Sequence, residues 1–124
     1  MEITINEKTY PLKASFAFLK KIEPSDIRES SGEKIEFGLP NALIQISEVG
    51  DVRYLVDLIV ALNTGLTPRL ERTAVEHYLE DECEDVEKLI DEVFDFLSRA
   101  NVCKMRLKKL DVLRKQAESP ELKA

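Results

Sequence analysis

The sequence has few of the residues that build common catalytic and metal sites. It holds two cysteines, Cys83 and Cys103, and one histidine, His77. These are too few for a disulfide framework and too scattered for a zinc site. The four glycines are also scattered, which argues against a glycine-rich phosphate loop. We therefore expect reduced thiols, no metal, no cofactor and no catalytic residue.

Long hydrophobic runs are also missing. The longest apolar segment, residues 52–62, includes Arg53 and Asp57 and has about half the length of the ~20 residues that a membrane span needs. The chain begins with acidic and polar residues instead of the basic stretch and apolar run of a signal peptide. We expect a protein that does not enter a membrane and stays soluble where it is made.

The composition instead favours one folded helical domain. With 44% hydrophobic and 34% charged residues, the 124-residue chain can form a core and is not a disordered polymer. The low glycine and proline content favours long regular elements. We predict a mainly α fold, with a single helical domain at residues 1–115 that includes an N-terminal β-hairpin (1–13), followed by a disordered tail at 116–124.

The N-terminal segment has the pattern of a hairpin. Ile3 and Ile5 alternate with polar residues, and Asn6-Glu7 is a plausible turn before the extended pattern resumes. A two-stranded ribbon is marginal alone and must pack on another element.

The next segment, residues 15–22, is predicted to be the helix on which the hairpin packs. Its apolar residues at helical spacing are Phe16, Leu19 and Ile22, and Phe18 widens the same face. Residues 23–37, punctuated by Pro, Ser and Gly, are predicted to be a solvated, mobile loop.

The middle of the chain contains two further predicted helices. A short one runs from about Pro40 to Ser47 and stops at Gly50. The second spans residues 51–63, with Asp51 as its cap. Its apolar side chains surround almost the whole helix, so we expect either a central core helix or a helix that contacts another subunit.

After Pro68 a helix of about ten residues is expected, and then the strongest periodic signal in the chain. The apolar residues of this last stripe are Val86, Leu89, Ile90, Val93, Phe94, Leu97 and Ala100, with Phe96 at one flank. The apolar residues after Asn101 are out of phase with this stripe. We predict two helices separated by a left-handed Asn101; the alternative is one long helix with two apolar faces.

Charge is divided sharply along the C-terminal half. Residues 71–97 hold eleven acids against Arg72 and Lys88, whereas residues 98–115 hold seven bases against Asp111. Pairing between adjacent antiparallel helices would explain this division. The alternatives are head-to-tail self-association or a charged protein partner. Nucleic acid is a further candidate for the basic stretch, but the net charge of −6 argues against it.

The acidic run at residues 81–85 lacks the alternating carboxylates and central glycine of a calcium loop. Acids near the start of a helix are favoured by the helix dipole. We expect a structural role for this run.

Taken in order, these elements resemble a known family. The hairpin at residues 1–10 leads into Phe16-x-Phe18-Leu19, followed by a helix start at residues 38–40, the apolar helix at 52–62 and the amphipathic segment that begins at 85–89. This order is similar to that of the tail assembly chaperones of long-tailed bacteriophages and of prophages of Gram-positive bacteria. The similarity covers about residues 1–110.

The resemblance implies a non-enzymatic protein of the host cytoplasm. Such chaperones coat the hydrophobic tape measure protein, help tail tube subunits polymerise around it, and are absent from the mature virion. Some exist in two forms related by a ribosomal frameshift, and this chain would be the short form. The family carries no catalytic residues over to this chain.

A chaperone for a long apolar client needs a surface that accepts amphipathic helices of many sequences. Aromatic and methionine side chains suit such a surface because they give large contact areas and adaptable packing. The candidate partner-binding residues are Phe94, Phe96, Val102, Met105 and Leu110.

Overall fold

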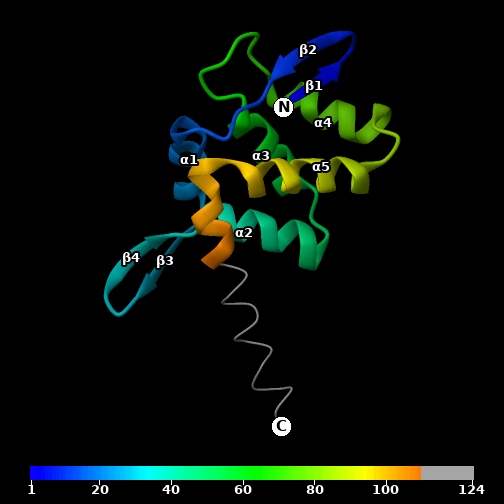
Figure 1. Ribbon diagram of the computed structural model, residues 1–124. Coiled ribbons are helices and arrows are strands. Elements are labelled where there is room, and N and C mark those ends of the chain that lie inside the picture. Colours follow the sequence, from blue (N-terminus) through cyan, green and yellow to red (C-terminus); the bar gives the residue numbers. More distant parts are fainter. Residues whose placement is uncertain (110–124) are drawn as a thin grey trace.

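The computed structural model of the chain describes residues 1–109, and Leu110 and the predicted tail at 116–124 lie outside the described residues. The fold is mainly α-helical, as predicted, with two small antiparallel hairpins. Helix α3 (Arg53–Leu62) runs through the middle and contacts α1 (Phe16–Ile22), α2 (Gly38–Ile44) and α4 (Arg72–His77). Helix α5 (Val86–Arg99) crosses the molecule beside them (Figure 1).

The predicted N-terminal hairpin is confirmed. Strand β1 (Glu2–Ile5) pairs with β2 (Lys8–Pro11), with Ile3 opposite Tyr10. The turn residues Asn6 and Glu7 both have positive φ, at 51° and 66°, which matches the twist of a two-residue hairpin turn. Ile3 and Ile5 are buried, so the hairpin is fixed to the helical core through one face.

Helix α1 is also confirmed, but its inner face differs from the prediction. Ser15 caps the helix by accepting a hydrogen bond from the backbone N–H of Phe18. Phe18 and Ile22 are buried, whereas Phe16 is 68% exposed. At 3.6 residues per turn, Phe16 and Phe18 lie about 200° apart around the helix, so they cannot both face the core. The placement of Phe16 on the inner face was wrong.

The prediction of a loop at residues 23–37 was wrong. A short 3₁₀ helix, η1 (Glu23–Ser25), leads into a second hairpin formed by β3 (Ile27–Ser30) and β4 (Glu33–Glu36). Ser31 and Gly32 turn the chain with positive φ values of 52° and 81°. Every residue of both strands is exposed, and Figure 1 shows the hairpin projecting from the helical body.

Helix α2 begins two residues before the predicted start and continues into a π-helical turn, η2 (Gln45–Val49). Its predicted inner stripe is buried: Leu39, Ala42, Leu43 and Ile46. The first residue of the helix, Gly38, has to be a glycine because the backbone of α1 passes very close to it. A Cβ at this position would meet the carbonyl oxygen of Ile22 at 1.8 Å. Gly50 ends the segment in the left-handed conformation.

Helix α3 is the core helix. The predicted cap was wrong: the N-cap is Val52, which makes no side-chain cap hydrogen bond, although Asp51 accepts a hydrogen bond from the backbone N–H of Arg53 at 3.1 Å. Four of its side chains, Leu55, Leu58, Ile59 and Leu62, have no exposed surface. The sequence left two explanations for a helix that is apolar on almost every side, a core helix or a contact with another subunit. In the structure, neighbouring elements of the same chain bury it.

Asn63 ends α3 and is the only buried polar side chain among residues 1–109. Its Nδ2 donates to the carbonyl oxygens of Pro11 (2.9 Å) and Pro68 (3.2 Å), and its Oδ1 accepts from the N–H of Leu70 (2.7 Å). One amide therefore joins the end of the first hairpin to the loop that precedes α4. Helix α4 then continues into a second π-helical turn, η3 (Tyr78–Glu82).

Helix α5 is the predicted amphipathic helix, with Leu89, Val93 and Leu97 buried. It ends at Arg99, where Ala100 adopts an extended conformation (φ −75°, ψ 129°), and residues 101–109 form a separate helix. The predicted break is confirmed and the single long helix is excluded. The predicted left-handed Asn101 was wrong, because Asn101 lies in the second helix and its φ is not positive.

Candidate partner-binding surface

The helix of residues 101–109 is fixed to the body of the protein along one side. Cys103 is completely buried on that side. One turn further on, Arg106 donates from Nε to Glu23 Oε2 at 2.9 Å and from Nη2 to the carbonyl oxygen of Glu36. The exposed fractions of the two charged side chains are 33% for Arg106 and 14% for Glu23, so water screens this pair only in part.

The aromatic ring of Phe37 adds to these contacts. We call the contacts of Arg106 with Glu23, Glu36 and Phe37 the anchor. The guanidinium of Arg28 lies 4.1 Å from the centre of the Phe37 ring, and that of Arg106 lies 5.9 Å from it, both within the range of cation–π attraction. Glu23 uses its second oxygen, Oε1, to accept from the N–H of Leu39 at 2.8 Å. The helix of residues 101–109 is thereby tied to η1, β4 and the start of α2.

The other side of this helix faces outward. Met105 is 66% exposed, and the neighbouring Lys104, Lys108 and Lys109 are exposed as well. Val102 is half-buried and packs against the core. Leu110 follows directly but lies outside the described residues. Met105 is therefore an apolar side chain surrounded by bases on a helix whose opposite side is anchored.

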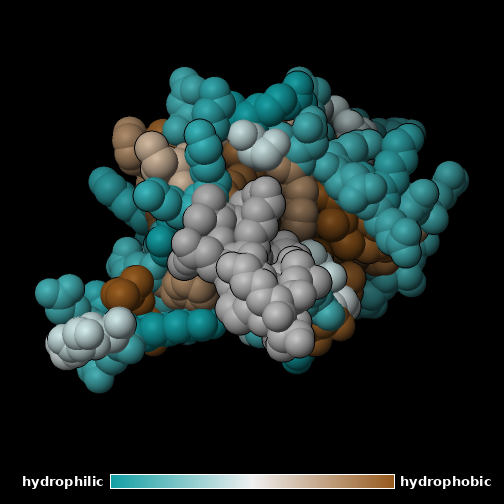
Figure 2. Space-filling model, turned by 60° about the horizontal axis from the view of Figure 1, so that its bottom comes forward, coloured by the Kyte–Doolittle hydropathy of each residue, from teal (hydrophilic) through white to brown (hydrophobic). Residues whose placement is uncertain are grey.

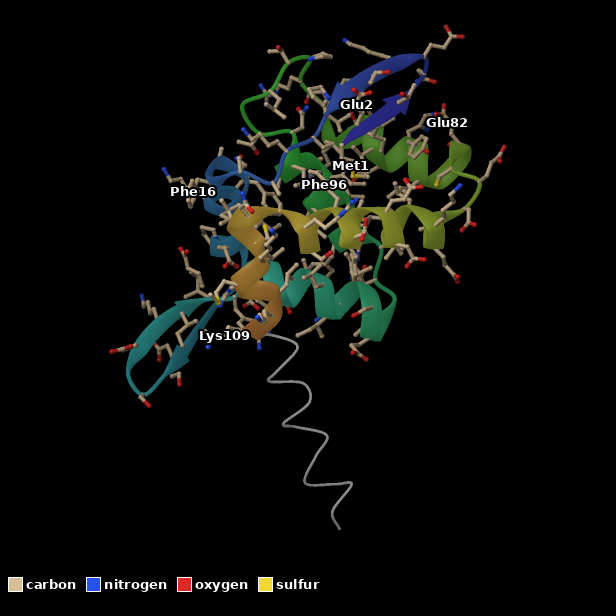
Figure 3. The ribbon with its side chains drawn as sticks, viewed as in Figure 1. Met1, Glu2, Phe16, Glu82, Phe96 and Lys109 are labelled. Atoms are coloured by element: carbon tan, nitrogen blue, oxygen red, sulfur yellow. The ribbon has the colours of Figure 1, made fainter. Side chains whose placement is uncertain are left out.

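The two phenylalanines of α5 occupy the flanks of its buried stripe. Phe94 and Phe96 are each half-buried against the core, and Figure 3 labels Phe96 on α5. The break at Ala100 puts Met105 on a different helix, which runs at an angle to α5 (Figure 1). Figure 2 shows hydrophobic side chains reaching the surface on the right-hand part of the face it presents, bordered by hydrophilic ones.

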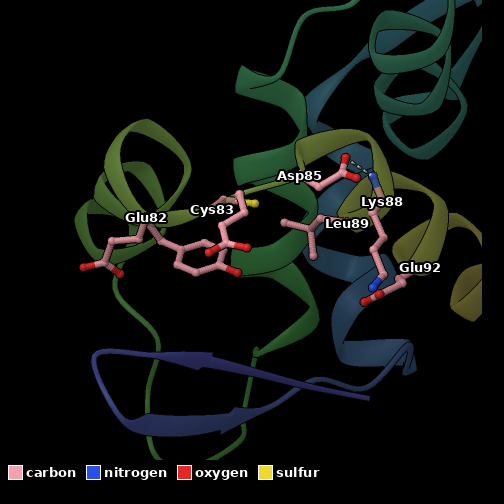
Figure 4. A pocket seen from close by; sticks show the side chains of 8 residues that line it. Glu82, Cys83, Asp85, Lys88, Leu89 and Glu92 are labelled. Atoms are coloured by element: carbon pink, nitrogen blue, oxygen red, sulfur yellow. Dashed lines mark hydrogen bonds between the residues drawn. The ribbon is translucent and has the colours of Figure 1, made fainter.

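The acidic run lies beside a shallow pocket of about 370 Å³ (Figure 4). Asp85 caps α5 by accepting from the N–H of Lys88 at 3.0 Å, which is the structural role expected of this run. Partial burial raises the pKa of Tyr78, with Cys83 as the next contributor. Within residues 1–109 no group of three His, Cys, Asp or Glu side chains could hold a metal ion.

The divided charge is not explained by paired antiparallel helices in the described part of the chain. One ion pair joins the acidic and basic stretches, Arg99 with Asp95 at 2.6 Å, and both residues belong to α5. Arg106 instead reaches back to Glu23, outside the acidic stretch. Most of the acids on α4, η3 and α5 are therefore open to solvent or to a partner.

Both cysteines are free thiols. Burial, with a smaller contribution from the negative charge of Glu23, raises the pKa of Cys103 to about 11. At neutral pH this thiol is protonated and serves as a small apolar side chain at the contact between the helix of residues 101–109 and the core.

Sequence reasoning missed the anchor. Arg106 is one of seven bases in a row of similar residues, and Glu23 and Phe37 belong to the segment that was predicted to be a loop. Glu23 and Arg106 are 83 positions apart in the sequence. The periodicity of a single helix cannot indicate a contact between residues so far apart. The only local signal of ordered structure near it was Ser31-Gly32, a turn dipeptide between two isoleucines.

These features define a mainly helical fold whose buried residues, within the described part of the chain, form one core, and whose helix of residues 101–109 is held against that core by a charged anchor. Residues 2–111 match a family model described as "phage tail assembly chaperone protein, TAC". The match spans most of the chain, so the chain belongs to this family of phage tail assembly chaperones.

A search of curated proteins found no match, and neither did a search of solved structures. In the described part of the chain, no helix is both long enough and apolar enough to cross a membrane.

Proposed function

We propose that this chaperone binds the tape measure protein of its phage and promotes polymerisation of the tail tube protein around it, without catalysing a reaction. It would act in the host cytoplasm and leave before the virion is complete. Membership of the family supports a role in tail assembly. The identity of the two partners is the part that we propose.

The observation that carries the proposal is the exposure of Met105 on an anchored helix. An exposed methionine can adapt to many apolar partners because its side chain is unbranched and polarisable. The anchor through Arg106 holds the helix in place before a client arrives, which reduces the ordering cost of binding. Phe96, half-buried on α5, would add aromatic area at low entropic cost.

Co-expression tests this surface. The tape measure protein of the same phage is produced alone, with the unmodified chaperone, and with the double variant Phe96→Ser, Met105→Ser. The unmodified chaperone should keep the client soluble, and the double variant should lose most of this effect. Because Phe96 is half-buried, circular dichroism and the thermal midpoint must show that the double variant is folded under the assay conditions.

A matched control removes exposed apolar area elsewhere. Ile27 and Val49 are 49% and 67% exposed, so the double variant Ile27→Ser, Val49→Ser should still keep the client soluble. If the Phe96 and Met105 variant protects as well as the unmodified chain, this surface is not the binding site. If the client is insoluble with the unmodified chain too, the tape measure protein is not its client, and a role as an adaptor for another protein takes precedence.

A further inference from the structure

The two edges of the β3–β4 hairpin differ, and the turn shows which backbone groups each edge exposes. Ser31 and Gly32 both have positive φ, so they form a two-residue turn, and the strand residues on either side of it bond to each other. Bonded and non-bonded positions then alternate along an antiparallel pair. On β3, Ile27 and Glu29 are therefore the residues whose backbone groups point away from β4. We call these outward groups the β3 edge.

Two hydrogen bonds agree with this alternation. The N–H of Phe37 donates to the carbonyl oxygen of Asp26 at 2.7 Å, which continues the ladder at the expected position. On β4, the carbonyl oxygen of Glu36 points outward and accepts from Arg106 Nη2. The other outward residue of β4 is Lys34, and lysine on an edge strand discourages the addition of a further strand. The protein therefore protects the β4 edge itself.

The β3 edge has no such protection. Within residues 1–109, nothing outside the hairpin bonds to the backbone N–H or carbonyl groups of Ile27 and Glu29. The side chain of Ile27 is 49% exposed, so uncovered apolar surface lies beside these groups. An edge with free backbone groups and an exposed isoleucine can accept one more strand.

The charge of the hairpin indicates which kind of strand it fits. Among residues 1–109, four charged residues of the two strands form no ion pair: Glu29, Glu33, Lys34 and Glu36. Three are acids and one is a base, so the hairpin has negative charge to spare. Opposite charges across a strand pair stabilise it, and like charges destabilise it. A basic strand is therefore favoured, and the equally acidic hairpin of a second copy is disfavoured.

A polar hollow of about 610 Å³ adjoins the start of β3. Its lining includes Ser25 and Asp26, the two residues before the strand, and Tyr54 from α3. Asn41 and Gln45 contribute side-chain amides to the same lining. Amides and hydroxyls both donate and accept hydrogen bonds, so they can satisfy the backbone groups of an extended chain. The hollow therefore offers bonding groups to a strand that continues beyond β3.

We propose that the β3 edge is a docking site for an extended segment of a partner protein, which adds to the hairpin as a third strand. Because Ile27 and Glu29 are two positions apart, their side chains lie on the same face. The segment accordingly carries an apolar and a basic residue two positions apart.

An α-helix cannot bind in this way, because its backbone N–H and carbonyl groups are already bonded to each other. The β3 edge is therefore separate from the surface around Met105, and the proposal does not depend on which client binds there. Figure 1 shows the hairpin projecting from the helical body, where a partner can approach it.

A short labelled peptide tests the docking site. It has valine and lysine two positions apart, threonine elsewhere and blocked ends, and fluorescence anisotropy measures its binding to the whole chain. The unmodified protein should bind it at low salt and more weakly in about 0.5 M salt, which screens the paired charges. A peptide with glutamate in place of lysine should bind roughly fivefold more weakly or worse at low salt, because attraction across the strands becomes repulsion.

Proline variants distinguish the two edges. Glu29→Pro removes an outward N–H of β3 but no hydrogen bond of the hairpin, so it should weaken peptide binding about tenfold. Lys34→Pro is the matched control, because Lys34 lies directly opposite Glu29 and its outward N–H belongs to β4. It should bind the peptide at least as well as the unmodified protein does. Glu29→Gln keeps the N–H and removes the charge, so it should weaken binding less than Glu29→Pro and only at low salt.

Amide hydrogen exchange followed by NMR locates the peptide on the unmodified protein, without any change to the hairpin. In the free protein, the outward amides of Ile27 and Glu29 should exchange faster than those of Arg28 and Ser30, which are bonded across the hairpin. Saturating peptide should slow exchange at Ile27 and Glu29 and leave Lys34 unchanged.

Several results would overturn the proposal. One is the absence of peptide binding to the unmodified chain at a peptide concentration of about 1 mM. Others are equal weakening by Glu29→Pro and Lys34→Pro, or slowed exchange at Lys34 instead of Glu29. If the peptide does not bind and sedimentation shows that Glu29→Pro weakens association between copies, a second copy occupies the β3 edge and the partner segment is wrong.

Discussion

Replacing Asn63 should destabilise the protein through three hydrogen bonds that a single amide makes. Its side chain bonds the carbonyl oxygens of Pro11 and Pro68 and the N–H of Leu70, and only 4% of the residue is exposed. Each bond contributes about 1 kcal/mol net, and Asn63→Ala leaves all three backbone groups without this partner. We expect a loss of about 3 kcal/mol, from a total that is typically ~5–15 kcal/mol.

Asn63→Asp is the sharper perturbation because it keeps the shape and changes only the chemistry. The oxygen that accepts from Leu70 remains, but the NH₂ group that donates to two carbonyls becomes a second oxygen that faces them. Burial and the two carbonyls disfavour the charged form, so the pKa of the introduced carboxyl should rise above its ordinary value of about 3.9. Protonated, this group can donate to one of the two carbonyls.

The sign of the pH dependence follows from this raised pKa. The folded variant binds its proton more tightly than the unfolded chain does, so stability falls as the pH rises. The penalty relative to the unmodified protein should therefore be smallest below about pH 4 and largest above the raised pKa.

Urea unfolding followed by circular dichroism at several pH values measures this dependence. The thermal midpoint of the Asn63→Asp variant at pH 7 should be lower than that of the unmodified protein by on the order of 10 °C. Asn101→Asp is the matched control, because Asn101 is exposed at the start of a helix, where an acid is tolerated. A loss below about 1 kcal/mol for Asn63→Asp, or a penalty that does not change with pH, would refute the assigned hydrogen bonds.

Two further outcomes are expected. Leu58→Asp should lower the free energy of unfolding by about 3 kcal/mol or more, because Leu58 has no exposed surface. The control Val49→Asp, at a 67% exposed position, should change it by about 0.5 kcal/mol. Equal unfolding midpoints for the two variants would mean that α3 is not the core helix. Iodoacetamide at pH 8 should label Cys83 first, because Cys103 is buried and its pKa of about 11 leaves little thiolate. If mass spectrometry finds Cys103 labelled first in the folded protein, the contact between the helix of residues 101–109 and the core is contradicted.

The helices with strong periodicity could be predicted from the sequence. The stripe that includes Leu89, Val93 and Leu97 is buried as expected, because a helix with a single apolar face has one way to cover it. Helix α3 could be predicted to be covered on most sides, because side chains such as Val56 and Leu58, about 200° apart around the helix, must both be covered by neighbours.

Residues 23–37 could not be assigned from local pattern. Both strands of the second hairpin are fully exposed, so they lack the alternation of buried and exposed residues by which a strand is recognised. Ile27 and Ile35 do not pair across the two strands; Ile27 is opposite Glu36, and Ile35 is opposite Arg28. The distant residue that contacts this segment is Arg106, which reaches Glu23 and Phe37, and a contact of that kind leaves no mark on local composition.

The candidate site residues were chosen from the sequence, and their arrangement in space could not be predicted from it. Met105 is exposed, as a contact residue must be, but Val102 and the two α5 phenylalanines are half-buried because they also cover the core. The chain leaves the helical conformation at Ala100, so the side of the molecule on which Met105 lies cannot be worked out by continuing the 100° steps of α5. The direction in which Met105 faces is set by Cys103 and Arg106 on the opposite side of its helix.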